Sequence, residues 1–328
     1  MTPSRSCLFG ILLGIVAALT ALRSTAQDAP ATPVEKPAKA AKKTSGSNNE
    51  FLEFMRVRRD SRKRPVALET SITRYEGVNS EGKKFLVDLI GVVHVGEREY
   101  YLALNEQFQQ YDATLYELVA PEGTRIPKGG RAAMDEGEGM NPIAALQLGM
   151  KSMLGLEFQL DHIDYTASSL VHADMSPEEF FDSMKKNEES VGRMLINSLG
   201  SSMAMQNKGQ SAEIGLALSM FSKDPTKSLR RTMAEQMQDM EGGMTIFNGK
   251  DGSTIINHRN SKVMEVLRSE LKKGHDELAI FYGAGHLPDM QKKLLEDFQM
   301  KRAGKFWLTA WDLDIKRDDK SSSKAGKE

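Results

Sequence analysis

The chain has 328 residues, of which 40% are apolar and 27% charged, with a formal net charge of −1 and one cysteine. These fractions are ordinary for a globular protein and exclude a collagen-like, wholly disordered or multi-spanning membrane chain. The near-zero net charge argues against a protein that coats nucleic acid, so we expect no nucleic-acid partner. A single cysteine allows neither an internal disulfide framework nor a cysteine-rich zinc site.

Residues 1–26 have the pattern of a secretory signal peptide. Arg5 precedes the apolar stretch Leu8–Leu22, and Ser24–Ala26 offers small residues for cleavage before Gln27. The stretch is shorter than the roughly 20 residues that a membrane-spanning helix prefers. We therefore predict an exported protein, periplasmic or secreted, with no integral membrane domain beyond this segment. An uncleaved N-terminal membrane anchor is the alternative.

Residues 27–64 are predicted to form a disordered linker. Residues 28–49 are rich in Ala, Pro, Lys and Ser and lack an apolar period, and the basic run Arg56–Pro65 follows them. Such a run can be attracted to an anionic surface or polymer, but a solvated linker end is the favoured interpretation. The polar tail, residues 317–328, is predicted to be disordered as well.

Between residues 65 and 316 the pattern alternates between strands and helices. Strands are predicted at 66–75, 84–95, 112–120, 277–282 and 306–313, and helices at 97–110, 255–273 and 288–301. Near-continuous apolar runs such as FLVDLIGVV indicate strands that are buried on both faces. The sequence therefore predicts an α/β fold, with a mixed, mostly parallel sheet and flanking helices.

The middle of this domain differs in composition. Fourteen of the 19 methionines lie between Met134 and Met244. A methionine surface that binds metal or haem is one interpretation, but methionine more often fills irregular helical cores or adaptable binding surfaces. We predict that residues 143–240 form a helical, methionine-rich insertion that caps the α/β core or lines a groove.

Two Gly-x-x-His sequences each follow a predicted strand. Gly91–His94 ends the strand before the helix at 97–110, and Gly283–His286 directly follows the strand ELAIFY. Ligands of open α/β sheets bind outside the carboxyl ends of the strands, and glycine permits close approach of the backbone. Both histidines are therefore expected at the same edge of the sheet.

Two charged residues lie on apolar faces. Glu117 shares one face of its predicted strand with Ala113, Leu115 and Val119, where a carboxylate is costly to bury unless it is paired. We expect it to meet a cation or a metal; a sheet-edge glutamate near water is the alternative. Arg259 lies in the apolar stripe of its helix, where it either reaches past the stripe to water or pairs with a buried carboxylate or substrate oxyanion.

The segments GVVHVG, LYEL, HRNxxxxxxL and YGAGHLPDM resemble, in order and spacing, the TraB/GumN (PrgY-like) family. This family belongs to the Tiki superfamily, together with erythromycin-esterase-like and ChaN-like proteins. The resemblance spans roughly residues 66–315 and departs from the family pattern at Val92 and Asp289. It implies an α/β fold in which both Gly-x-x-His motifs and a glutamate converge in one cleft. The animal Tiki members are described as metal-dependent proteases.

Carried over to this chain, the resemblance implies that His94, Glu117 and His286 are the active-site residues, and that Arg259 is the arginine of the family's Arg-Asp/Asn helix. Two neutral imidazoles and a carboxylate can hold a divalent metal and leave positions open for a water that the metal acidifies. Without a metal, histidine and glutamate can act as general base and acid, with Arg259 stabilising an oxyanion.

Other catalytic motifs are missing from the sequence: it contains no GxSxG, no HExxH and no P-loop lysine motif. His162, Asp164 and His172 lie in ligand-like segments and are candidate substrate contacts. His94, Glu117, Arg259 and His286, together with the resemblance to the TraB/GumN family, favour an exported hydrolase of the Tiki/TraB type, metal-dependent and of peptidase or esterase type, that acts on a peptide or small molecule. The alternative is a non-catalytic protein that binds a peptide signal or haem in the same cleft.

Overall fold

The structure is a computed structural model that describes residues 54–121, 123–124, 126–129, 153–186, 222, 224–239 and 254–314. Its elements are β1 (Met55–Arg59), β2 (Pro65–Val78), β3 (Lys84–Val92), β4 (Val95–Gly96), α3 (Arg98–Phe108), β5 (Ala113–Tyr116), β6 (Glu157–Phe158), α5 (Gln159–His162), β7 (Leu170–His172), α6 (Pro177–Lys186), α9 (Pro225–Asp239), the π-helix η3 (Thr254–His258), α11 (Arg259–Lys272), β8 (Glu277–Gly283), the 3₁₀ helix η4 (Ala284–His286), α12 (Leu287–Glu296) and β9 (Lys301–Asp312). Within these ranges, no helix is both long and apolar enough to cross a membrane. The predicted signal peptide and the C-terminal tail lie outside them.

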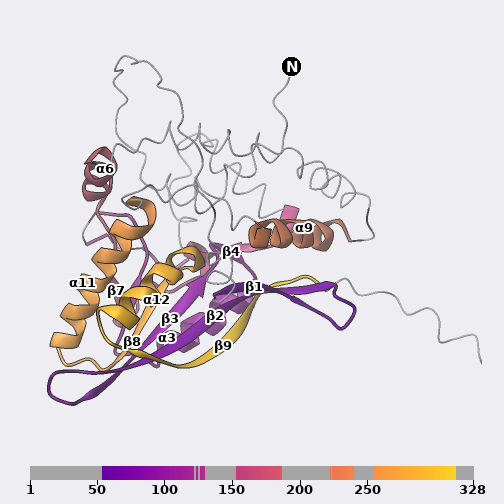
Figure 1. The fold of residues 1–328 in the computed structure, drawn as a ribbon. Coiled ribbons are helices and arrows are strands. Elements are labelled where there is room, and N and C mark those ends of the chain that lie inside the picture. Colours follow the sequence, from indigo (N-terminus) through magenta and orange to yellow (C-terminus); the bar gives the residue numbers. More distant parts are fainter. Residues whose placement is uncertain are drawn as a thin grey trace, which may run out of the picture.

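A mixed sheet of seven strands organises the fold (Figure 1). β3, β8, β5 and β7 lie side by side in that order and run parallel. β2 pairs antiparallel with β3, and both β1 and β9 pair antiparallel with β2. Four of the seven strands are therefore parallel to one another. The predicted α/β fold, with its mixed, mostly parallel sheet and flanking helices, is confirmed.

Both faces of the central strands are covered by helices. On β3, Val87 and Leu89 pack in one buried cluster with residues of α11 and α12, while Ile90 and Val92 pack in a second cluster with residues of α3. The residues of α9 join the second cluster. Because successive side chains of a strand point to opposite faces, both sets must be apolar, which accounts for the continuous apolar run in the sequence.

The predicted linker, residues 27–64, is wrong at its C-terminal end, because part of the basic run is a strand of the sheet. β1 pairs with β2 along its length, and Met55 and Val57 point inward and are buried. The arginines that alternate with them also stabilise the fold: the Nε atoms of Arg56 and Arg58 donate to the two carboxylate oxygens of Glu69 at 2.8 and 2.6 Å. The folded domain therefore begins before residue 65.

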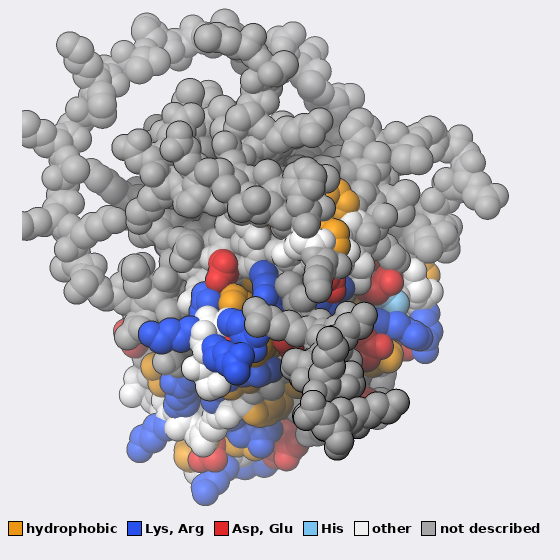
Figure 2. Space-filling model, turned by 90° about the vertical axis from the view of Figure 1, so that its right-hand side faces the viewer, with side chains coloured by type: hydrophobic (Ala, Val, Ile, Leu, Met, Phe, Trp, Pro, Cys, Tyr) orange, Lys and Arg blue, Asp and Glu red, His pale blue; other side chains and the backbone are white. Residues whose placement is uncertain are grey.

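Further charges of the basic run are paired as well. Arg59 lies 3.0 Å from a carboxylate oxygen of Glu235 on α9, and Arg64 lies 2.6 Å from one of Asp60. Figure 2, which faces the side of the molecule where β1 lies in Figure 1, shows Lys and Arg side chains gathered on this surface with Asp and Glu among them. The run is thus part of a folded surface rather than a solvated linker end.

The predicted helical insertion, residues 143–240, also contains strands. β6 pairs with β4 in a small separate sheet, and β7 is the outer strand of the parallel set, next to β5. The described helices of this region are α5, α6 and α9. Most of its methionine-rich remainder lies outside the described residues.

Candidate functional site

Strand pairing brings three of the predicted site residues to one edge of the sheet. β3 and β8 pair in parallel with Val92 opposite Gly283, the last residue of each strand. His94 and His286 follow these two ends, and Glu117 follows the end of β5, on the other side of β8. The carboxyl ends of parallel strands share one edge, so the fold carries all three residues to the same place. The sequence pattern predicted this for the two histidines, and the family resemblance implied it for Glu117.

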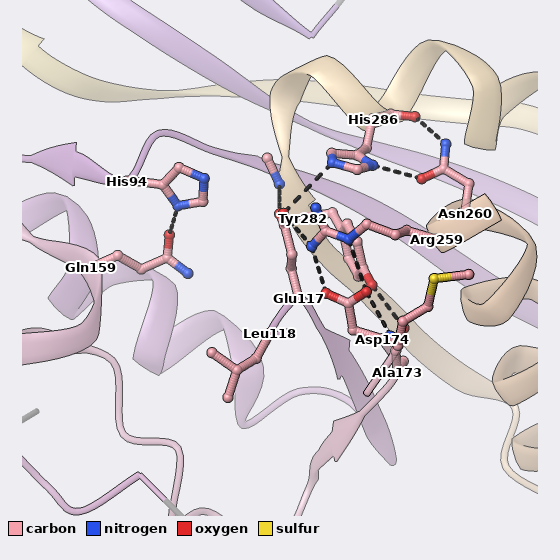
Figure 3. Close-up of polar contacts among 12 residues, drawn as sticks. His94, Glu117, Leu118, Gln159, Ala173, Asp174, Arg259, Asn260, Tyr282 and His286 are labelled. Carbon is pink, nitrogen blue, oxygen red and sulfur yellow. Dashed lines mark hydrogen bonds and ion pairs between the residues drawn. The ribbon is translucent and has the colours of Figure 1, made fainter. Parts of the chain in front are cut away.

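The three side chains surround Gly283. A Cβ atom placed on this glycine would lie 3.2 Å from Glu117 Oε2, 3.7 Å from His94 Nε2 and 3.8 Å from His286 Cδ2. The backbone N–H of Gly283 also donates to Glu117 Oε2 at 2.8 Å. A side chain at this position would press on Glu117 and touch both histidines, so the glycine leaves open the space in which the three groups face one another (Figure 3).

Arg259 binds two buried carboxylates. Its Nε and Nη2 donate to the two oxygens of Asp174 at 2.9 and 2.5 Å, and Nη2 also donates to Glu117 Oε1 at 2.7 Å. The side chains of Glu117, Asp174 and Arg259 are 7%, 0% and 3% exposed. Of the two interpretations of Arg259, pairing with a buried carboxylate is therefore the one observed. Glu117 is not a glutamate near water at the sheet edge.

The charges of this trio do not cancel. Burial by itself raises the pKa of Glu117, but the nearby Arg259, His286 and His94 and the N–H of Gly283 together outweigh it and hold that pKa well below its usual range. Burial likewise disfavours the charged form of Arg259, but Glu117 and Asp174 raise its pKa well above the usual value. Glu117 and Arg259 are therefore ionised at neutral pH. Counted by formal charges, one arginine against two carboxylates, the buried trio has a net charge of −1.

Asn260 holds the ring of His286. Its Nδ2 donates to the backbone oxygen of His286 at 3.0 Å and to Asp289 Oδ2 at 2.8 Å, so its Oδ1 is an acceptor, 2.7 Å from His286 Nδ1. Nδ1 therefore carries the proton, and Nε2 presents a lone pair 3.6 Å from Glu117 Oε1. Burial lowers the pKa of His286 to about 4, so the ring is neutral at neutral pH.

His94 has its own amide partner. Its Nδ1 lies 3.0 Å from Gln159 Oε1, and the backbone N–H of Gln159 donates to the backbone oxygen of His94 at 2.9 Å. Gln159 is 4% exposed, and its Nε2 donates to the hydroxyl of Tyr165 at 2.8 Å. Figure 3 shows the two histidines on either side of Glu117, each with an amide side chain beside its ring.

Three of these residues were not among the predicted site residues. Asp174 ends the ligand-like segment His172–Asp174, and Asn260 follows Arg259 in the HRN segment. Both therefore lie within two residues of a predicted site residue. Gln159 lies in a segment without a clear period or motif. Nothing in the sequence separates it from the other polar residues nearby.

The three weaker candidates lie outside this cluster. His162 and Asp164 help to line a pocket of about 440 Å³ beside α3, and none of His94, Glu117, Arg259 and His286 lines that pocket. His162 Nε2 is 3.2 Å from Glu157 Oε2, and Asp164 pairs with Lys128. The third candidate, His172, donates from Nε2 to the backbone oxygen of Leu118 at 2.6 Å.

The donor types around Gly283 match those of a divalent metal site, namely imidazole nitrogen and carboxylate oxygen. Within the described part of the chain, however, no group of three His, Cys, Asp or Glu side chains is arranged to hold a metal ion as it stands. A metal bound by His94, Glu117 and His286 would therefore draw these side chains closer together than they are here.

Comparison of the chain with protein-family models, with curated proteins and with solved structures found no match in any of the three.

Proposed function

We propose that the chain is an exported, metal-dependent hydrolase that acts on peptides, with His94, Glu117 and His286 as the metal ligands. The observation that carries the proposal is the convergence of the three side chains around Gly283, at the carboxyl edge of the parallel strands. The resemblance of the same residues to the TraB/GumN family supports it, and so does the signal-like pattern of residues 1–26.

The electrostatics of the cluster favour a bound cation. The lone pair of His286 Nε2 and the carboxylate of Glu117 are both acceptors, and they face each other at 3.6 Å. Two acceptors at this distance repel unless a proton or a cation lies between them. The buried trio of Glu117, Asp174 and Arg259 adds a net charge of −1. A divalent cation would more than offset this charge and would bind both the lone pair of His286 Nε2 and the carboxylate of Glu117.

Each residue then has a distinct role. A divalent metal, when bound, supplies an acidified water at neutral pH and polarises the scissile carbonyl. His94 and His286 would hold the metal through Nε2, and Glu117 would hold it through its carboxylate. Arg259 donates hydrogen bonds to Asp174 through Nε and Nη2, and to Glu117 through Nη2. It therefore positions Glu117 rather than stabilising an oxyanion.

The test is Zn²⁺ binding by the full chain, measured by calorimetry and by metal analysis, together with hydrolysis of a peptide and ester panel. We expect one site per chain that is lost in His94→Ala and His286→Ala. We also expect loss in Gly283→Ala, whose methyl group would enter the space between the three side chains. Hydrolysis should require the metal and be lost in the same variants.

His275→Ala is the matched control. His275 precedes β8, at the opposite end of the strand from the cluster, and pairs with Glu270. This variant should bind Zn²⁺ and hydrolyse substrate as the unchanged chain does. Zn²⁺ binding and hydrolysis that survive loss of both His94 and His286 would refute the proposal. Metal binding without hydrolysis of any substrate would favour a non-catalytic binding protein.

A further inference from the structure

Gln159 contacts His94 twice, through its backbone and through its side chain. We infer that Gln159 is a positioning residue that holds His94 in the tautomer with the proton on Nδ1, so that Nε2 faces Glu117 as an acceptor. The inference deepens the proposed function, since it states how the second histidine is prepared to bind a cation, and as a role in metal binding it rests on that function.

The connections of Gln159 leave its side chain little freedom. The backbone bond to His94 continues the pairing of β4 with β6, so it fixes the start of α5 against the residues that follow β3. The amide is buried and also donates to the hydroxyl of Tyr165, itself a buried residue. A buried amide held at both ends can fix the orientation of the imidazole that it contacts.

His286 offers an independent comparison within the same cluster. Its Nδ1 donates to the amide oxygen of Asn260, whose orientation is fixed by two acceptors. Gln159 and Asn260 come from different elements, α5 and α11, yet each places an amide oxygen at about the same distance from the Nδ1 of a histidine. With both protons on Nδ1, two Nε2 lone pairs face the carboxylate of Glu117, which suits a cation rather than a hydrogen-bonded pair.

If the Gln159 amide had the opposite orientation, the other ring nitrogen of His94 would carry the proton. The hydroxyl of Tyr165 can donate as well as accept, so a reversed amide would still be bonded to it. The amide nitrogen would then donate to His94 Nδ1, and the proton on Nε2 would point toward Glu117. In that arrangement Nε2 of the neutral His94 ring is a hydrogen-bond donor and cannot bind a metal. The protonation of the two ring nitrogens of His94 therefore distinguishes the two cases.

The first experiment reads the tautomer directly. In the metal-free full chain with ¹⁵N-labelled histidine, the ring resonances of His94 are identified by their loss in His94→Ala. We expect a protonated Nδ1 and a bare Nε2 in the unchanged chain, and a mixture of tautomers in Gln159→Leu. A proton on Nε2 in the unchanged chain would overturn the inference. This measurement needs no metal, so it is decisive even if Gln159→Leu does not fold.

The second experiment is a Zn²⁺ titration. Gln159→Leu should weaken Zn²⁺ binding by about 10- to 100-fold, the usual effect of losing a partner that orients a ligating histidine. Gln159→Glu, which keeps an acceptor oxygen, should retain binding. Asn105→Leu is the control, because Asn105 holds the same segment through the backbone of His162 and Asp164 without contacting His94.

The outcomes separate the two proposals. Equal binding by Gln159→Leu and the unchanged chain, or equal weakening by Asn105→Leu, would contradict the positioning role of Gln159. If the unchanged chain binds no Zn²⁺ through His94 and His286, the proposed function fails, and the tautomer of His94 still decides whether Gln159 orients that ring.

Discussion

Arg259 is the residue on which the buried charges of the cluster depend. Asp174 and Glu117 are almost fully buried, and the guanidinium of Arg259 is the cation that bonds to both. A buried carboxylate that loses its partner is strongly unfavourable, because burial removes the water that would otherwise solvate it. The position of Glu117 therefore depends on a side chain from another element, α11.

We predict that Arg259→Met destabilises the fold by about 3–5 kcal/mol, the usual cost of removing one partner of a buried ion pair. The measurement is urea unfolding of the full chain. Lys262→Met is the control on the same helix, since Lys262 pairs with Glu179 in a partly exposed salt bridge and should cost less than about 1 kcal/mol. Similar losses in the two variants would contradict the account.

The sequence identified the residues that stand out from an apolar pattern. Glu117 and Arg259 were conspicuous as charges on apolar faces, and His94 and His286 as repeated motifs after strands. Gln159 could not be found in this way. Its role depends on the pairing of β4 with β6, two strands of two residues each, and such short elements leave no period in a sequence.

At the scale of elements, β1 is a strand whose charged residues obscure its alternating apolar pattern in the sequence. Met55 and Val57 alternate with Arg56 and Arg58, which is the period of a half-buried strand, but the run of arginines and lysines resembles a linker. The sequence alone does not show which residue neutralises these arginines. In the fold, Glu69 on β2 accepts hydrogen bonds from both and makes a basic strand stable at this position. The longer central strands were predictable because both of their faces are apolar.

We predict that a chain beginning at residue 65 is several kcal/mol less stable than one beginning at residue 50, which retains β1. The shorter chain loses the buried side chains of Phe54, Met55 and Val57, each of which contributes about 1.5–3 kcal/mol by burial. It also leaves the carboxylate of Glu69 without its two arginines. Thermal unfolding of the two chains checks this prediction, and equal midpoints would show that β1 contributes nothing to stability.

At the scale of the whole molecule, the parallel arrangement of the sheet creates the site. β8 lies far from β3 and β5 in the sequence, yet the carboxyl ends of the three strands meet at one edge, and the residues that follow them surround Gly283. Helices pack on both faces of these strands. The alternation of strands and helices was enough to predict this edge, whereas the bonds among Glu117, Asp174 and Arg259 required the fold.

The most direct test of the central claim is a crystal structure of the full chain grown with Zn²⁺, with the metal located by its anomalous scattering. The account predicts one ion between the three side chains, about 2.0–2.2 Å from the Nε2 atoms of His94 and His286 and from a carboxylate oxygen of Glu117. Bound Zn²⁺ at other positions only, with the cluster around Gly283 unchanged, would contradict it.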